Sequence, residues 1–162
     1  METKFNVFEI LEIAEKVEQR GAKFYLGAAQ LFSQENLKNC LYALAERKVR
    51  LRQTWTKMRK DFSDRTGEFG TFDPDNYVLS NPEVMAGLTS FGMRAGRSRQ
   101  FTGQEDKEAI LRDAMHRENA VITFYQGLRD FARDPAGREI IDTLVKKVNQ
   151  FVLELMHELE GL

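Results

Sequence analysis

The chain of 162 residues has few of the residues that build disulfides and metal centres, with one cysteine, Cys40, and two histidines. One cysteine cannot close a disulfide within the chain, and no paired-cysteine metal motif is present. No apolar run approaches the length that spans a bilayer. The amino terminus is periodic and charged, and it lacks the uninterrupted apolar core of a signal peptide. We therefore expect a cytoplasmic protein without membrane association.

An excess of charge is also absent, because 24 basic residues face 25 acidic ones and give a formal net charge of −1. Proteins that bind nucleic acids usually carry a basic excess, so nucleic acid is not an expected partner. With 42% apolar and 30% charged residues, the composition is that of an ordinary globular chain. A single domain over residues 1–162, with a good core, is the simplest organisation.

Apolar residues recur at steps of three and four, which indicates helices. The predicted helices cover about 6–32, 34–62 and 104–132, and a fourth follows the breaker DPAG at 134–137 and continues to the end. Residues 63–105 differ in character, with six of the eleven glycines and two of the three prolines. Within them, SNPEVMAGLTSF at 80–91 is expected to form a short helix. A connection this long is explained by an all-α four-helix bundle in which helices two and three run parallel, joined by one long crossover.

The two helical pairs resemble each other at an offset of one hundred residues. EQRGAKFY at 18–25 can be laid on ENAVITFY at 118–125. The identical pairs at this offset include Ala14 with Ala114, Glu18 with Glu118, Phe24 with Phe124, Tyr25 with Tyr125 and Gly27 with Gly127. This similarity suggests duplication of a helical hairpin.

The repeat also locates a charge inside three of the four apolar stripes. Glu18 interrupts the first stripe, Lys48 the second and Glu118 the third, whereas the fourth has the apolar Val148 at the matching position. Position-matched residues of a duplicated bundle should lie in one layer, so we predict that these three charges converge in the core. Isolated buried charges are costly, and they persist when they are paired or bound to metal.

These features resemble the ferritin-like superfamily, and within it the rubrerythrin-like branch. The resemblance implies a di-iron centre in which Glu18 and Glu118 are the single-Glu ligands and Tyr25 and Tyr125 border the metal. It also implies a Glu-x-x-His pair on each of helices two and four. Those pairs should fall at 48 and 51 and at 148 and 151, where this chain has instead Lys48, Leu51, Val148 and Phe151. Four of the six expected ligands are therefore replaced, and the two Cys-x-x-Cys pairs of a rubredoxin module are missing.

Two interpretations of Lys48 remain open. In the first, its buried ammonium supplies part of the positive charge that metal ions would supply, while Val148 and Phe151 fill the other side. One ammonium cannot neutralise two carboxylates, so either one Glu is protonated or the two tyrosines donate hydrogen bonds to them. In the second interpretation, helix rotation brings the Lys48 head to the surface and only its stem is buried.

The function expected from this pattern is that of a degenerate bundle without a di-iron centre, acting as a non-catalytic structural or partner-binding protein. No catalytic residue, metal or cofactor is expected, and no particular protein partner is indicated. Helix four has a second apolar set, formed by Val145, Val152 and Leu153, which either the crossover or a second subunit could cover, and we expect a homodimer. The alternatives are a small-ligand carrier that uses the bundle interior and an iron-dependent oxidoreductase acting on peroxide or oxygen. The latter needs a site rebuilt from Glu18 and Glu118 with other acids, for example Glu15 or Glu154 with His157.

Overall fold

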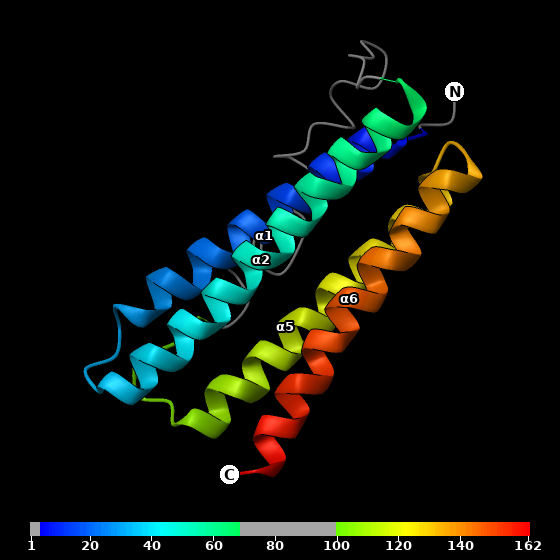
Figure 1. Cartoon of the computed structure of the whole chain (residues 1–162). Helices are drawn as coiled ribbons and strands as arrows, with labels where there is room; N and C mark the ends of the chain where they lie inside the picture. The colour runs from blue at the N-terminus through cyan, green and yellow to red at the C-terminus, as the bar shows by residue number, and fades with distance from the viewer. Residues whose placement is uncertain (1–3, 69–99) are drawn as a thin grey trace.

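The computed structural model describes residues 4–68 and 100–162, and these residues form a bundle of helices (Figure 1). Within the described part no β-strand forms beyond a single bridge, so the prediction of an all-α bundle is confirmed for these residues. The elements in chain order are α1 (Val7–Ala29), α2 (Glu35–Thr66), α5 (Lys107–Leu128), the 3-10 helix η2 (Arg129–Phe131) and α6 (Pro135–Glu160).

Polar side chains fix where the helices begin. Asn6 and Glu9 form a capping box at the start of α1, in which each side chain accepts a hydrogen bond from the backbone N–H of the other. Asp106 and Asp134 cap α5 and α6 through one hydrogen bond each, which the side chain accepts from the backbone N–H three residues ahead. The helix α6 thus begins inside the segment that the sequence suggested as a breaker. Pro135 is tolerated there because the first helical residue has no intrahelical N–H bond to lose.

The second helix also differs from its predicted bounds. It continues past residue 62 to Thr66 and ends at Gly67, whose φ of 71° is left-handed. A glycine in this conformation is a common way to end a helix, because it has no Cβ to strain. The first helix ends earlier than predicted, at Ala29 rather than near residue 32.

The helices pack as two antiparallel hairpins, α1 with α2 and α5 with α6, lying side by side (Figure 1). At one end Phe5 joins the hairpins, because its N–H donates to the Phe131 carbonyl at 2.6 Å and its carbonyl accepts from Arg133 at 2.8 Å. At the other end Gly103, with φ of 95°, lies so close to the Leu31 carbonyl that a Cβ would collide with it. Helices α2 and α5 therefore point the same way (Figure 1). Residues 69–99, which contain the short helix predicted at 80–91, lie outside the described residues.

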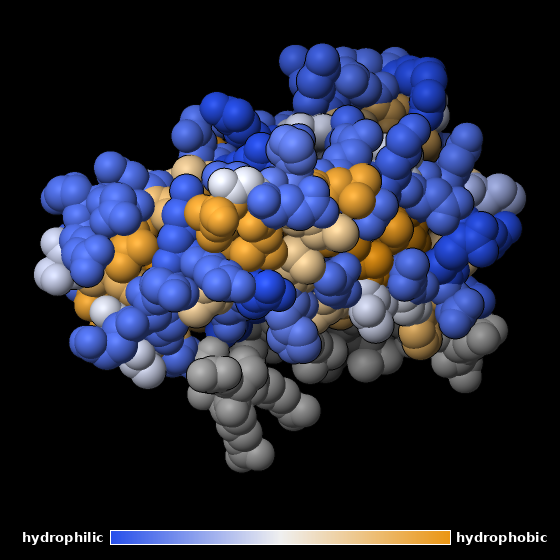
Figure 2. Space-filling model, turned by 90° about the horizontal axis from the view of Figure 1, so that it is seen from below, coloured by the Kyte–Doolittle hydropathy of each residue, from blue (hydrophilic) through white to orange (hydrophobic). Residues whose placement is uncertain are grey.

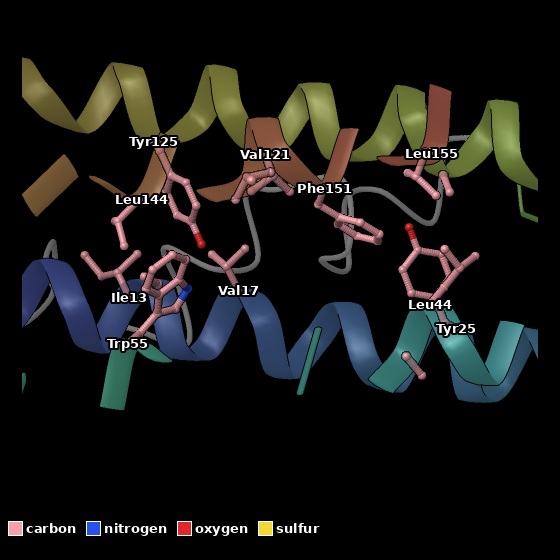
Figure 3. Packing of buried hydrophobic residues seen from close by; sticks show 14 of the residues in the cluster. Ile13, Val17, Tyr25, Leu44, Trp55, Val121, Tyr125, Leu144, Phe151 and Leu155 are labelled. Atoms are coloured by element: carbon pink, nitrogen blue, oxygen red, sulfur yellow. The ribbon is translucent and has the colours of Figure 1, made fainter. Parts of the chain in front are cut away.

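The core lies between the two hairpins and is made from the predicted apolar stripes. Figure 3 shows Ile13, Val17, Val121 and Leu144 meeting there from both hairpins, all of them fully buried. Hydrophilic side chains dominate the face shown in Figure 2, where apolar residues reach the surface in separate areas. None of the described helices combines the length and the apolar character that crossing a membrane requires.

Candidate functional site: a buried ionic cluster

Lys48 lies at the centre of the bundle with its side chain fully buried. Its Nζ donates a hydrogen bond to Glu118 Oε1 at 2.5 Å and is 2.7 Å from Glu18 Oε2. Both carboxylates are as buried as the lysine. The interpretation of Lys48 as a lysine with its head in water is therefore wrong, and the three charges that interrupt the apolar stripes meet in one place.

The two tyrosines complete the cluster in a reciprocal way. Tyr25 of α1 donates to Glu118 Oε2 on α5 at 3.0 Å, and Tyr125 of α5 donates to Glu18 Oε1 on α1 at 2.9 Å. Both rings are fully buried, and they project toward the space between the hairpins from opposite sides (Figure 3). Each carboxylate is thus held by Lys48 on one oxygen and by a tyrosine of the other hairpin on the second oxygen.

Helical spacing accounts for this arrangement. Glu18 and Tyr25 are seven residues apart on α1, close to two turns, so both side chains lie on one face. Glu118 and Tyr125 have the same spacing on α5. Since α1 and α5 run antiparallel, the Glu of each helix lies opposite the Tyr of the other, and both hydrogen bonds form together. Lys48 comes from α2 and has no counterpart on α6, where Val148 stands.

Burial and the neighbouring carboxylates set the protonation of the lysine and the tyrosines. Burial lowers the pKa of Lys48, but the charges of Glu118 and Glu18 outweigh burial, and the net pKa is raised. The pKa of Tyr25 lies well above its usual value because of burial and then Glu118. The pKa of Tyr125 is raised in the same way by burial and Glu18. At neutral pH the cluster therefore contains an ammonium and two neutral phenols that donate hydrogen bonds.

The pKa of Glu118 is also displaced from its ordinary value. Burial raises its pKa most, Lys48 opposes the rise and Glu18 adds to it, and the net result is a raised pKa. Of the two ways of relieving the excess negative charge that the sequence left open, the structure shows the one in which both tyrosines donate hydrogen bonds to the carboxylates. The raised pKa also makes protonation of Glu118 easier than that of an exposed glutamate.

Trp55 is a member of this site that the motif comparison did not identify. Its side chain is fully buried on α2 and lies near the Tyr125 hydroxyl (Figure 3). Trp55 opposes part of the rise in the Tyr125 pKa, although its indole N–H does not form a regular hydrogen bond with the described residues. In the sequence, Trp55 lies on the apolar stripe of α2, two turns after Lys48. That position predicts burial, but it does not predict an interaction with a polar group.

The positions expected to carry the remaining ligands do not suit a di-iron centre. Val148 is fully buried and Phe151 nearly so, while Leu51 is half-buried. The guanidinium of Arg47 lies over the Phe151 ring at 5.0 Å from its centroid. None of these apolar side chains offers a lone pair, and the ammonium of Lys48 stands between the two carboxylates. In residues 4–68 and 100–162, no three His, Cys, Asp or Glu side chains gather in a way that could hold a metal ion.

The residues considered for a rebuilt metal site are engaged elsewhere. Glu15 accepts two hydrogen bonds from Arg59 of α2, at 2.8 and 3.2 Å. Glu154 forms an ion pair with Arg47, and His157 is exposed near the end of α6. The structure therefore does not bring Glu15, or Glu154 with His157, to the carboxylates of the cluster.

Arg117 is a second buried charge that the sequence reading missed. It is 4% exposed, pairs with Asp113 at 2.7 Å and stacks over the Phe24 ring at 4.1 Å from the centroid. The spacing of Asp113 and Arg117 is the i, i+4 spacing of a helical ion pair, which was a usable signal. Its burial was not predictable, because it depends on Phe24 of the other hairpin.

Comparisons with protein-family models, curated proteins and solved structures give no match to this chain. The resemblance to the rubrerythrin-like branch therefore rests on the residue pattern. The description of the ionic cluster does not depend on this resemblance, because its distances and burial are those of the structure.

Proposed function

We propose that the protein is a metal-free member of the ferritin-like superfamily, of the rubrerythrin-like branch, in which the Lys48 ammonium takes the place of the metal ions. The observation that carries this proposal is the position of Nζ, within 2.7 Å of Glu18 and 2.5 Å of Glu118 in a fully buried site. The parallel direction of α2 and α5 supports the long crossover of that superfamily. The duplicated Glu and Tyr pairs support the assignment further.

In this proposal the protein acts as a structural or partner-binding bundle and not as an enzyme. The cluster holds the two hairpins together, because Lys48 and Tyr25 of the first hairpin bind Glu118 of the second, and Tyr125 of the second binds Glu18 of the first. The charged groups are buried, and the raised pKa values of both tyrosines keep their phenols neutral. The cluster is suited to fixing one arrangement of the hairpins.

The partner that we propose is a second copy of the chain, bound through α6. Of the apolar set that suggested this, Val152 is buried and Val145 half-buried, but Leu153 is 54% exposed. Met156 on the same helix is 40% exposed. Exposed apolar side chains on one helix fit a symmetric dimer of two such helices. The cytoplasmic location expected from the single cysteine is part of the proposal.

Elemental analysis tests the metal-free assignment. The protein is purified without chelators, incubated anaerobically with ferrous iron, exposed to air and desalted. We expect no stoichiometric iron, manganese or zinc, and no absorption band of an oxo-bridged di-iron centre. About two iron ions per chain, as in the di-iron carboxylate proteins, would overturn the proposal in favour of the oxidoreductase.

A further inference from the structure

A groove of about 590 Å³ runs along the α1–α2 hairpin and is lined by residues of these two helices. Its apolar surface comes from Ala22 and Leu26 of α1 and Val49 of α2. Leu26 and Val49 are 45% and 41% exposed, so both offer apolar surface to a ligand in the groove. The volume lies within the range of small-molecule sites, about 300–1,000 Å³.

Four cations surround this apolar surface: Lys23, Arg52, Lys57 and Lys60. Among the described residues, none of the four makes an ion pair with a carboxylate, although six other arginines do so, namely Arg47, Arg50, Arg59, Arg112, Arg117 and Arg129. The acid among the described lining residues is Glu18, which is engaged by Lys48 and Tyr125. The groove is therefore a positively charged region without internal neutralisation.

Two apolar side chains lie at one end of the groove and two lysines lie at the other end. Val49 lies near one end and Lys60 at the other, eleven residues apart on α2, or about 16 Å at the helical rise per residue. Leu26 lies at the Val49 end, because α1 and α2 are antiparallel. Lys57 and Lys60 are three residues apart on one face of α2, so both ammonium groups can reach one anion at their end.

We propose that this groove binds a single-chain anionic amphiphile of the fatty-acid class. The carboxylate binds Lys57 and Lys60, and the alkyl chain covers Leu26 and Val49. A protein partner fits less well, because the groove is lined by eleven residues, whereas a stable protein interface uses about 20–30 residues on each side. The site goes beyond the proposed function, since nothing in it requires the central cluster to be free of metal.

Calorimetric titration with laurate, below its micellar concentration, tests the site on the full chain. We expect saturable binding of one laurate per chain, weakened by added salt because the head-group contact is ionic. Dodecyltrimethylammonium, with the same tail and the opposite charge, should not bind. Equal binding of the two amphiphiles would show that the tail alone is recognised and would overturn the proposal. Absence of saturable laurate binding would also overturn it.

Charge reversal assigns the binding to this groove. The double substitution Lys57→Glu and Lys60→Glu should weaken laurate at least tenfold, and Val49→Gln should weaken it through the tail. The control, Lys146→Glu with Lys147→Glu, makes the same charge change on α6 and should leave the affinity unchanged. Far-ultraviolet circular dichroism establishes that each variant is folded. Unchanged affinity in the Lys57 and Lys60 variant would refute the site, while the metal analysis would stand unaffected.

Discussion

Replacing Lys48 with Met removes the cation of the central cluster while keeping a long apolar side chain in its place. Nζ lies 2.7 Å from Glu18 and 2.5 Å from Glu118. At an effective dielectric constant of about 20, each contact is worth about 6 kcal/mol of attraction before desolvation is subtracted. Removing one partner of such a buried group typically costs about 3–5 kcal/mol, and we expect that loss here. It is a large part of a total stability of about 5–15 kcal/mol.

The cost should depend on pH in one direction. A carboxyl whose pKa is higher in the folded state destabilises the fold at neutral pH, and acidification through the folded pKa toward the unfolded value removes that penalty. The pKa of Glu118 is already raised in the parent, from an ordinary value of 4.5, and Lys48 opposes the rise. Without Lys48 the Glu118 pKa rises further, so acid relieves the variant more than the parent. The deficit of the variant should therefore be largest near neutral pH and shrink toward pH 5.

Urea denaturation of the parent and Lys48→Met at pH 7.5 and pH 5 measures both quantities. Adding Glu118→Gln to Lys48→Met removes one of the two facing carboxylates and should recover part of the stability at pH 7.5. This double variant also provides a folded protein if the single variant is too unstable. Lys146→Met, on the exposed face of α6, is the matched control and should change the stability by less than about 0.5 kcal/mol. A Lys48→Met protein as stable as the parent at both pH values would refute the reasoning.

Tyr25→Phe and Tyr125→Phe each remove one buried hydrogen bond to a carboxylate. Each should lower the free energy of unfolding, measured by urea denaturation, by about 1.5–3 kcal/mol. An unchanged free energy of unfolding would show that the hydrogen bond does not form. Gly103→Ala should destabilise by about 1–3 kcal/mol, because φ is positive and the Cβ meets the Leu31 carbonyl, whereas Gly27→Ala, in open space on α1, should stabilise by about 0.5–1 kcal/mol. Thermal unfolding measures the stability of both glycine variants, and an equal loss of stability in the two would contradict the backbone geometry at Gly103. Light scattering at micromolar concentration should give about twice the 18.8 kDa chain mass, and a monomer would argue against the α6 interface.

Helix content was predictable because it depends on local periodicity. The apolar steps of three and four identified α1, α2, α5 and α6, and the core residues on them are buried as expected. Helix ends were less predictable, since they depend on single residues with two possible roles. DPAG contains a proline and a glycine and suggests a breaker, yet Asp134 caps the helix and Pro135 starts it. The end of α2 likewise depends on a single residue, Gly67.

The central cluster was predictable because the repeat relates positions across the bundle. The offset of one hundred places Glu18 and Glu118, and Tyr25 and Tyr125, at equivalent positions, and Lys48 breaks the equivalence. The crosswise pairing of each tyrosine with the Glu of the other hairpin was not predictable, since it depends on the distance between hairpins. Burial of Arg117 and the position of Trp55 beside Tyr125 depend on the same tertiary contacts.

The charge state of Lys48 is the quantity on which the account depends most directly. Heteronuclear NMR of the lysine Nζ groups, with Lys48 assigned by its loss in Lys48→Met, measures it. The account predicts an ammonium signal whose protons exchange slowly with water, because the side chain is fully buried. Since its pKa is raised above the ordinary value of 10.5, the signal should remain that of an ammonium up to pH values above 10.5. A Lys48 signal that exchanges rapidly with water and loses its ammonium character below pH 10.5 would contradict the buried ionic cluster.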